Sequence, residues 1–176
     1  AASAGNHAQG VAFAARELGI QATIFMPLGV ALPKLQATRG YGAAVELRGH
    51  IFDETLAAAI AFAEETGAVF IHPFDHPDVI AGQGTLGLEI LEQVPDVETI
   101  VVPIGGGGLA AGVAIAVKAQ AALSGRDVRI IGVQAANAAA FPISLNAGTA
   151  TQISISPTIA DGIAVARPGS LTFEII

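Results

Sequence analysis

Cysteine and tryptophan are absent from the 176 residues, and charged residues make up only 13% of them. Without cysteine there is no disulfide framework, thiolate metal site or catalytic thiol, so a small secreted disulfide scaffold is excluded and a cytoplasmic location is expected. Basic residues are also scarce, because 8 Lys and Arg against 15 Asp and Glu give a net charge of −7. No stretch is rich in Lys or Arg, which argues against nucleic-acid binding and favours small molecules or other subunits as partners.

A membrane-spanning segment is also missing, although 52% of the residues are hydrophobic. The 19 residues Thr99–Val117 carry no charge and have the length of a span. They contain Pro103 and Gly105–Gly108, and such a backbone would leave N–H groups unsatisfied in lipid. No basic segment precedes an apolar core, so no signal peptide is recognised. We interpret the chain as soluble, without a membrane partner.

Short apolar runs alternate with segments of helical periodicity along the whole chain. Val- and Ile-rich runs without polar alternation are typical of parallel strands covered on both faces, so the pattern predicts an α/β protein with three-layer, open parallel sheets. The expected strands are 22–26, 43–47, 68–71, 99–103 and 128–133. The expected helices are 6–18, 33–37, 53–66, 79–93, 109–123 and one beginning at 171.

Local signals mark the ends of several of these helices. Asn6 and Asp53 are expected N-caps, and Gly19 and Gly67 are expected stops. The first helix has a predicted apolar face of Val11, Ala14, Ala15 and Leu18, and the third has one of Leu56, Ile60 and Ala63.

Four consecutive glycines, Gly105–Gly108, stand between an expected strand and an expected helix. They offer backbone N–H groups with no Cβ in the way, and the following helix adds the positive end of its dipole. This arrangement predicts a phosphate site. Its spacing toward Gly112 approximates a dinucleotide fingerprint, so a nicotinamide-binding Rossmann module is an alternative. That alternative needs an acid after the next strand, where Gln134 stands.

The stretch Ser3-Ala4-Gly5-Asn6-His7 precedes the first expected helix. Ser and Asn are ordinary capping residues, so a well-made helix start explains the stretch by itself. Its free N–H groups are also placed to receive a carboxylate, and the Asn6 amide to meet a ligand hydroxyl.

Taken in order, four stretches give the chain a family resemblance: Ser3–His7, Pro73–Thr85, the glycine loop, and Ala160-Asp161-Gly162. Together they resemble the threonine dehydratase (threonine ammonia-lyase) family of pyridoxal-phosphate enzymes, which share the tryptophan synthase β-subunit fold, fold type II. The resemblance covers essentially all 176 residues. It implies a small Rossmann-like domain over residues 1–75, followed over 76–176 by part of a larger cofactor domain.

The resemblance also implies roles for particular residues. Asn6 would hydrogen-bond the phenolic oxygen of pyridoxal 5′-phosphate, and Gly162 would approach the cofactor or substrate. The phosphate would be held by Gly105, Gly106, Gly107, Gly108 and Leu109. The substrate carboxylate would be received by Ser3, Ala4, Gly5, Asn6 and His7. The implied reaction is dehydration and deamination of threonine or serine to 2-oxobutanoate or pyruvate and ammonia. The resemblance further implies a homo-oligomer, and leaves open a biosynthetic or a catabolic enzyme.

The chain departs from the family in one respect that bears on catalysis. The family's Schiff-base lysine lies upstream of the Ser-x-Gly-Asn-His stretch, and neither Lys34 nor Lys118 matches it. We therefore expect an internal fragment without a catalytic residue and without turnover of its own.

Two alternatives to the dehydratase stand beside the Rossmann module, a serine racemase and a non-catalytic binding domain. Serine racemases share the fold, but their eukaryotic type has a second Ser where Ala4 stands. A non-catalytic binding domain would use the same loops. A metal site at His72, Asp75, His76 and Asp78 is not expected, because Pro73 and Pro77 impose an extended turn.

Overall fold

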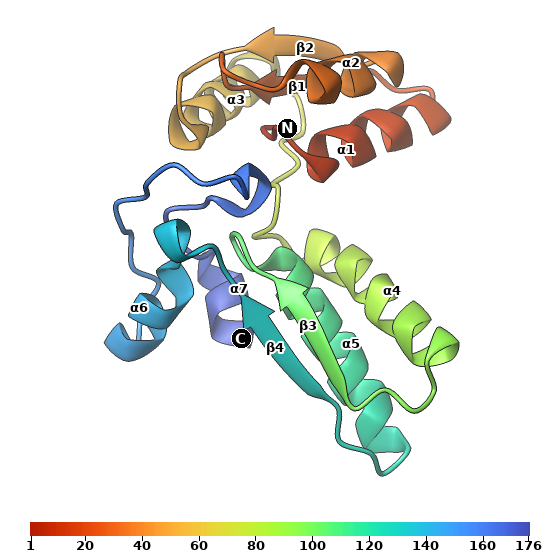
Figure 1. Ribbon diagram of the computed structural model, residues 1–176. Coiled ribbons are helices and arrows are strands. Elements are labelled where there is room, and N and C mark those ends of the chain that lie inside the picture. Colours follow the sequence, from red (N-terminus) through yellow and green to blue (C-terminus); the bar gives the residue numbers. More distant parts are fainter. The chain divides into compact units, whose positions relative to one another are not determined.

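The computed structural model describes residues 1–176, which form two compact units, Ala1–Pro73 and Phe74–Ile176 (Figure 1). Each unit contains one two-stranded parallel sheet. The α/β class expected from the sequence is therefore confirmed. The division follows Pro73, whereas the sequence places the boundary after residue 75. Assignment of the second unit as a cofactor domain stays a prediction.

The N-terminal unit alternates helices with strands. Its elements are α1 (Asn6–Glu17), β1 (Thr23–Met26), α2 (Leu32–Gly40), β2 (Ala44–Leu47) and α3 (Phe52–Thr66). β1 pairs in parallel with β2, with Thr23 opposite Ala44, and a bridge from Ala2 to Phe25 extends the sheet on the other side of β1.

Side-chain alternation along β1 builds three layers in this unit. Ile24 and Met26 lie on one face, with Ala8 and Ala12 of α1, and Phe25 lies on the opposite face, against Ala59 of α3. Successive residues of a strand point to opposite faces, so one short buried strand serves both cores. All six side chains are buried.

The second unit contains α4 (Pro77–Gln93), β3 (Thr99–Pro103), α5 (Gly108–Leu123), β4 (Arg129–Val133), α6 (Ala140–Ala147) and α7 (Ser170–Ile175), with 3₁₀ turns η1 (Ala136–Ala138) and η2 (Asp161–Ile163). β3 and β4 are parallel, with Thr99 opposite Arg129 and Pro103 opposite Val133. β3 agrees residue for residue with the expected strand 99–103.

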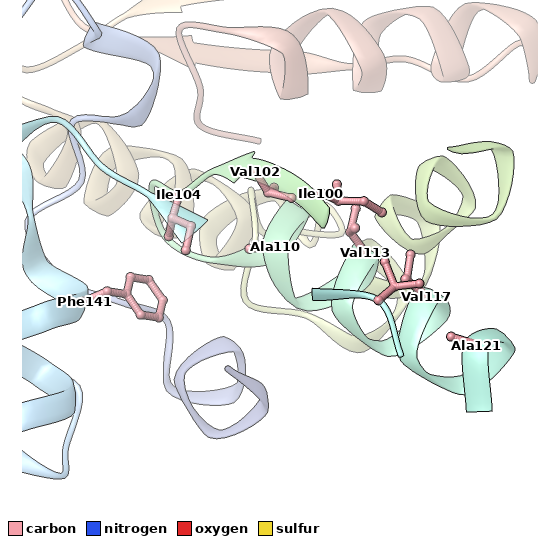
Figure 2. Close-up of a cluster of buried hydrophobic side chains, with 9 residues drawn as sticks. Ile100, Val102, Ile104, Ala110, Val113, Val117, Ala121 and Phe141 are labelled. Carbon is pink, nitrogen blue, oxygen red and sulfur yellow. The ribbon is translucent and has the colours of Figure 1, made fainter. Parts of the chain in front are cut away.

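The core of this unit lies between β3 and α5 (Figure 2). Ile100 and Val102 pack with Val113 and Val117, all of them buried. Val101, on the other face of β3, is 59% exposed. One face of this sheet is therefore open within the chain, whereas the sequence predicts cover on both faces.

Glycines bring α4 and α5 close together. A Cβ added at Gly112 of α5 would lie 2.3 Å from the carbonyl oxygen of Ile80 and 2.7 Å from the nitrogen of Gly84. Because any side chain at position 112 would meet the α4 backbone, this glycine sets the spacing of the two helices.

Both expected N-caps are wrong by two residues or fewer. α1 begins at Asn6 with Gly5 as its N-cap, because the Ser3 hydroxyl accepts from the Gly5 N–H at 3.1 Å and so shapes the preceding turn. α3 has Ile51 as its N-cap, and Asp53 lies in its first turn. There the Glu54 carboxylate accepts from the His50 N–H at 2.7 Å. The predicted stops hold, since Gly19 and Gly67 both have positive φ.

Residues 68–71 do not form the expected strand, and Val69 is 82% exposed. A β-strand forms when its backbone hydrogen-bonds to a neighbouring strand, and no strand pairs with this segment.

The predicted helix faces are only partly correct: Ala15 of α1 is buried and Leu56 of α3 packs against the core, as expected, but other predicted residues are not buried. In α1 the buried residues include Ala8 and Ala12, whereas Leu18 is 72% exposed beyond the helix end. In α3 Thr55 and Ala59 are buried and Ile60 is 38% exposed. Thr55 tolerates burial because its hydroxyl is within hydrogen-bond distance of the carbonyls of Arg48 and Ile51.

Measured against the thickness of a bilayer, none of the helices is long and apolar enough to be a membrane span.

Candidate active site

The four glycines form the turn between β3 and α5, where the sequence places a phosphate site. Gly106, Gly107 and Gly108 are buried, and Gly105 is half-buried. Gly107 is the N-cap of α5, with φ +108° and ψ −12°. That positive φ is a conformation that other residues rarely adopt, so the turn into the helix requires glycine here.

The N–H groups of this loop are unpaired. Those of Gly105, Gly106, Gly107, Gly108 and Leu109 have no acceptor in the chain, and the first intramolecular bond of α5 runs from Ala111 N to Gly107 O at 2.8 Å. Buried donors without acceptors cost free energy unless a ligand or water satisfies them. A row of donors at the positive end of a 16-residue helix fits a phosphate group.

The glycines are enclosed by side chains of the same unit. A Cβ at Gly106 would lie 2.4 Å from the Phe74 ring, and one at Gly107 would lie 2.7 Å from the Thr172 hydroxyl. A Cβ at Gly108 would be 2.9 Å from Phe74 Cα. Protein packing therefore demands glycine at all three positions, in addition to any demand made by a ligand.

Gly162, the remaining predicted cofactor residue of this unit, lies in the η2 turn and is exposed. Its neighbour Ile163 contacts the loop, since a Cβ at Gly105 would lie 3.2 Å from Ile163 Cα. Leu109 is half-buried in the first turn of α5. Ile163, the residue after Gly162, thus lies beside Gly105, and Leu109 follows the last glycine of the loop directly.

The stretch Ser3–His7 lies in the N-terminal unit and leads into α1. Two of its N–H groups are already bonded, Ser3 N to Phe25 O at 3.0 Å and Gly5 N to the Ser3 hydroxyl at 3.1 Å. Asn6 is exposed, and its side chain makes no hydrogen bond within the chain. The donors open to a carboxylate are therefore fewer than the sequence predicts, and they centre on the start of α1.

His7 is held in the neutral form. Burial lowers its pKa to about 4, from an ordinary value of 6.5. Its Nε2 lies 3.4 Å from the carbonyl oxygen of Ile71. Because a carbonyl only accepts, Nε2 carries the proton and Nδ1 is left as an acceptor. His7 therefore tethers the segment after α3 to the start of α1.

Gln134 stands where a nicotinamide-binding site would need an acid, and its amide is fully used within the unit. Its Nε2 donates to Ile104 O at 3.3 Å, and its Oε1 accepts from Phe141 N at 2.9 Å. The side chain connects the end of β4 to the segment before the glycine loop, and leaves no carboxylate for a ribose.

Of the two lysines, Lys118 lies in the same unit as this loop and Lys34 lies in the other unit. Lys118 is an exposed residue of α5 whose Nζ is 2.9 Å from Asp127 Oδ1, and it lowers the pKa of that carboxyl. Ten residues of helix separate it from Gly108, about 15 Å along the axis. Lys34 is a half-buried residue of α2 in the other unit. No group of three or more His, Asp or Glu side chains is placed to hold a metal ion.

Two residues at the glycine loop are missed by the sequence analysis. Thr172 is fully buried and its hydroxyl is 2.6 Å from Gly106 O, while Asp75 accepts from the N–H groups of Ser170 and Thr172. In the sequence Asp75 stands out only as a member of the family stretch Pro73–Thr85 and as a possible metal ligand, and Thr172 only as part of a C-terminal helix. Their separation of 97 residues leaves no local signal.

Fold and site together define a class: an α/β protein with a glycine-rich phosphate loop between a parallel strand and a helix. Comparison with known proteins assigns the family. The pyridoxal-phosphate dependent enzyme family matches residues 1–176, and the chain belongs to that family. The resemblance noted in the sequence is thereby confirmed, and the family's cofactor, pyridoxal 5′-phosphate, carries the phosphate that the unpaired donors fit.

Three relatives illustrate the similarity. The chain is 56% identical to the L-threonine ammonia-lyase of Thermotoga maritima over 100% of its own length and 43% of that protein. It matches the structure of a processed threonine deaminase isoform 2 from Solanum lycopersicum with TM-score 0.89 and 45% identity, over 99% of this chain and 50% of that one. It matches maize serine racemase with TM-score 0.90 and 38% identity, over 99% and 51% of the two chains. The chain thus spans about half the length of these relatives.

Proposed function

We propose that the protein containing this chain is a pyridoxal-phosphate dependent threonine ammonia-lyase. It would convert threonine to 2-oxobutanoate and ammonia, and serine to pyruvate and ammonia. The observation that carries the proposal is the buried glycine loop with five unpaired N–H groups, which suits the cofactor's phosphate. Support for the substrate comes from 56% identity to an L-threonine ammonia-lyase over the whole chain.

The bound cofactor would supply an electron sink for the bond broken at the amino acid's α-carbon. The residues of this chain would bind and orient the cofactor. The N–H groups of Gly105, Gly106, Gly107, Gly108 and Leu109 would bind the phosphate, aided by the dipole of α5. Such helix ends contribute roughly 0.3–2 kcal/mol toward an anion, so the loop orients the group and supplies only part of its affinity.

Residues at the start of α1 would recognise the remaining groups. We assign the substrate carboxylate to the stretch Ser3, Ala4, Gly5, Asn6 and His7, in which the N–H groups of Ser3 and Gly5 are bonded within the chain and the N–H groups at the start of α1 are open to it. The exposed Asn6 amide would hydrogen-bond the cofactor's phenolic oxygen, and Gly162 would lie close to cofactor or substrate. A neutral His7 adds no charge beside the carboxylate and keeps the loop tethered to Ile71.

Removal of the α-proton needs a base, and the lysine of the second unit is not placed to provide it. Lys118 is about 15 Å along α5 from its first residue, and it is engaged with Asp127. The base and the lysine attachment would come from the rest of the protein. We further propose that the whole protein is a cytoplasmic homo-oligomer, which fits apolar side chains as exposed as Leu123, at 83%.

An assay of the whole protein tests the proposal. With cofactor present, threonine should yield 2-oxobutanoate and ammonia in equal amounts, detected by ketoacid and ammonia assays. The 176-residue chain is the matched control and should bind the cofactor without turnover. A whole protein that shows no cofactor absorbance and binds NAD instead would exclude the lyase.

Serine racemase is the second candidate, because maize serine racemase superposes with TM-score 0.90. Ala4 favours the lyase, since it lacks the hydroxyl that a second base on the opposite face would use. Chiral analysis of serine after incubation separates the two. Formation of D-serine faster than pyruvate would favour the racemase.

A further inference from the structure

The carbonyl of Gly106 is held by two donors from the start of α7. The buried Thr172 hydroxyl lies 2.6 Å from Gly106 O, and the Gly169 N–H donates to the same oxygen at 3.0 Å. Thr172 Oγ1 is also 3.2 Å from Gly169 O. A hydroxyl has one proton, and the shorter distance assigns it to Gly106.

This carbonyl controls the direction of an N–H group in the phosphate loop. In a trans peptide the C=O and the following N–H point in opposite directions, and the chain contains no cis peptide bond. With Gly106 O directed at Thr172 and Gly169, the N–H of Gly107 must point away from α7. That N–H has no acceptor in the chain. Rotation of this peptide would turn a carbonyl oxygen toward the anion in its place.

Asp75 in turn holds Thr172. Its Oδ2 accepts from Ser170 N at 2.9 Å and its Oδ1 from Thr172 N at 3.1 Å. A carboxylate that accepts two N–H groups at the first turn of α7 fixes that turn with charge-assisted hydrogen bonds. The contact is close, since a Cβ at Gly169 would lie 2.3 Å from Asp75 Oδ1.

We infer that Thr172 and Asp75 are positioning residues for the phosphate loop, acting through the orientation of the Gly106–Gly107 peptide. The inference rests on the proposed function, since it takes the anion at this loop to be the cofactor's phosphate. Thr172 would act directly on the Gly106 carbonyl, and Asp75 at one remove by capping α7. Neither residue would touch the cofactor.

The test compares variants made in the whole protein that contains this chain. Thr172→Val keeps shape and removes the hydroxyl, and should weaken binding of pyridoxal 5′-phosphate roughly tenfold, the effect of one well-aligned hydrogen bond. Thr172→Ser restores the hydroxyl and should restore affinity. Asp75→Asn keeps the size of the side chain but replaces one of the two accepting oxygens with an NH₂ group. This variant should weaken cofactor binding roughly threefold.

Thr38→Val is the matched control. Thr38 is fully buried and its hydroxyl donates to the Lys34 carbonyl at 3.0 Å, in the N-terminal unit. Its loss removes the same kind of bond and should leave cofactor affinity unchanged. The second readout needs no cofactor: the Gly107 amide resonance of the cofactor-free protein should shift in Thr172→Val and return in Thr172→Ser.

The outcomes separate this inference from the proposed function. A wild-type protein that binds neither pyridoxal 5′-phosphate nor inorganic phosphate would contradict both. Wild-type binding that Thr172→Val leaves intact, with the Gly107 resonance unmoved, would overturn the positioning role alone. If Thr172→Val does not fold, Asp75→Asn decides by the same two measurements.

Discussion

Three helices of this chain begin with glycine as the N-cap, and the starts of two of them, α1 and α5, are built differently. Gly5 has φ −136° and a Cβ there would meet nothing within 4 Å. Gly107 has φ +108° and a Cβ there would collide with Thr172 and Phe141. At α1 a neighbouring hydroxyl satisfies one N–H, whereas at α5 the whole row of donors is unpaired. At the start of α1 glycine leaves the backbone free of side-chain contacts, whereas at the start of α5 close packing requires glycine.

This difference suggests a division of work between the loops. A phosphate is the same in every reaction cycle, and the packed loop at α5 suits a fixed anion site. A substrate enters and leaves, and the open start of α1 allows side chains such as Asn6 to adjust. The four predictions below change one side of this comparison at a time.

The largest effect is expected at Gly107. Gly107→Val places a branched side chain at φ +108°, 2.7 Å from the Thr172 hydroxyl, and should cost the chain about 3 kcal/mol and its cofactor affinity. Denaturation and cofactor titration measure the two losses. Gly148→Val is the control, because Gly148 has φ +68° with open space around it. Equal losses in both variants would mean that backbone strain alone, and not packing at the loop, accounts for the effect.

A smaller loss is expected at the contact between α4 and α5. Gly112→Ala adds a Cβ 2.3 Å from Ile80 O, which the two helix backbones can relieve only by moving apart. We expect a net cost of about 2 kcal/mol in urea denaturation. Gly82→Ala, on α4 with nothing within 4 Å, serves as the control. An unchanged free energy of unfolding for Gly112→Ala would show that the helices can separate without loss.

His7 should make the stability of the chain depend on pH. Its pKa is about 4 when folded and 6.5 ordinarily, so between these values the unfolded state binds more protons. Stability should therefore rise by roughly 1–2 kcal/mol from pH 4 to pH 6.5 and stay level above. Urea denaturation across this range measures the slope, and His7→Gln should remove it. His50→Gln, at an exposed site, is the control, and the same slope in both variants would rule out His7 as its source.

The smallest effect is a gain, expected at Gly10. This glycine is exposed inside α1, and a Cβ there would meet nothing within 4 Å. Gly10→Ala should stabilise the chain by about 0.5–1 kcal/mol, because it reduces the entropy lost when the helix forms. A thermal melt detects the rise. A fall in melting temperature would indicate that the start of α1 is packed like that of α5.

Elements with strong local signals were predicted well. The sequence predicts β3 at Thr99–Pro103, because a run of Val and Ile is followed there by a glycine turn, and the structure has the strand with these bounds. Caps were less predictable, since Asn6 and Asp53 are good capping residues that the structure places inside the first turn. A cap depends on where the preceding chain enters, and in α1 the Ser3 hydroxyl determines that entry.

Some residues of the candidate site could be predicted from the sequence, and others could not. The glycine loop could be found from the sequence because four adjacent glycines are a local pattern. The roles of Asp75 and Thr172 could not, because each is an ordinary residue whose partner is distant in the sequence. The predicted reason for Gly107 also changes: its Cβ would meet Thr172 and Phe141, which are side chains of the protein itself.

The sequence by itself determined the family, the α/β class and the glycine loop, since each of these depends on residue type and order over short stretches. Only the tertiary structure decided which loop carbonyl is held and which N–H groups remain unpaired. The Gly106 carbonyl accepts from Thr172 and Gly169, and Asp75 accepts from the N–H of Thr172, 97 residues away, at 3.1 Å. Hydrogen bonds act over a few ångströms, so a contact of this kind exists only once the chain has folded.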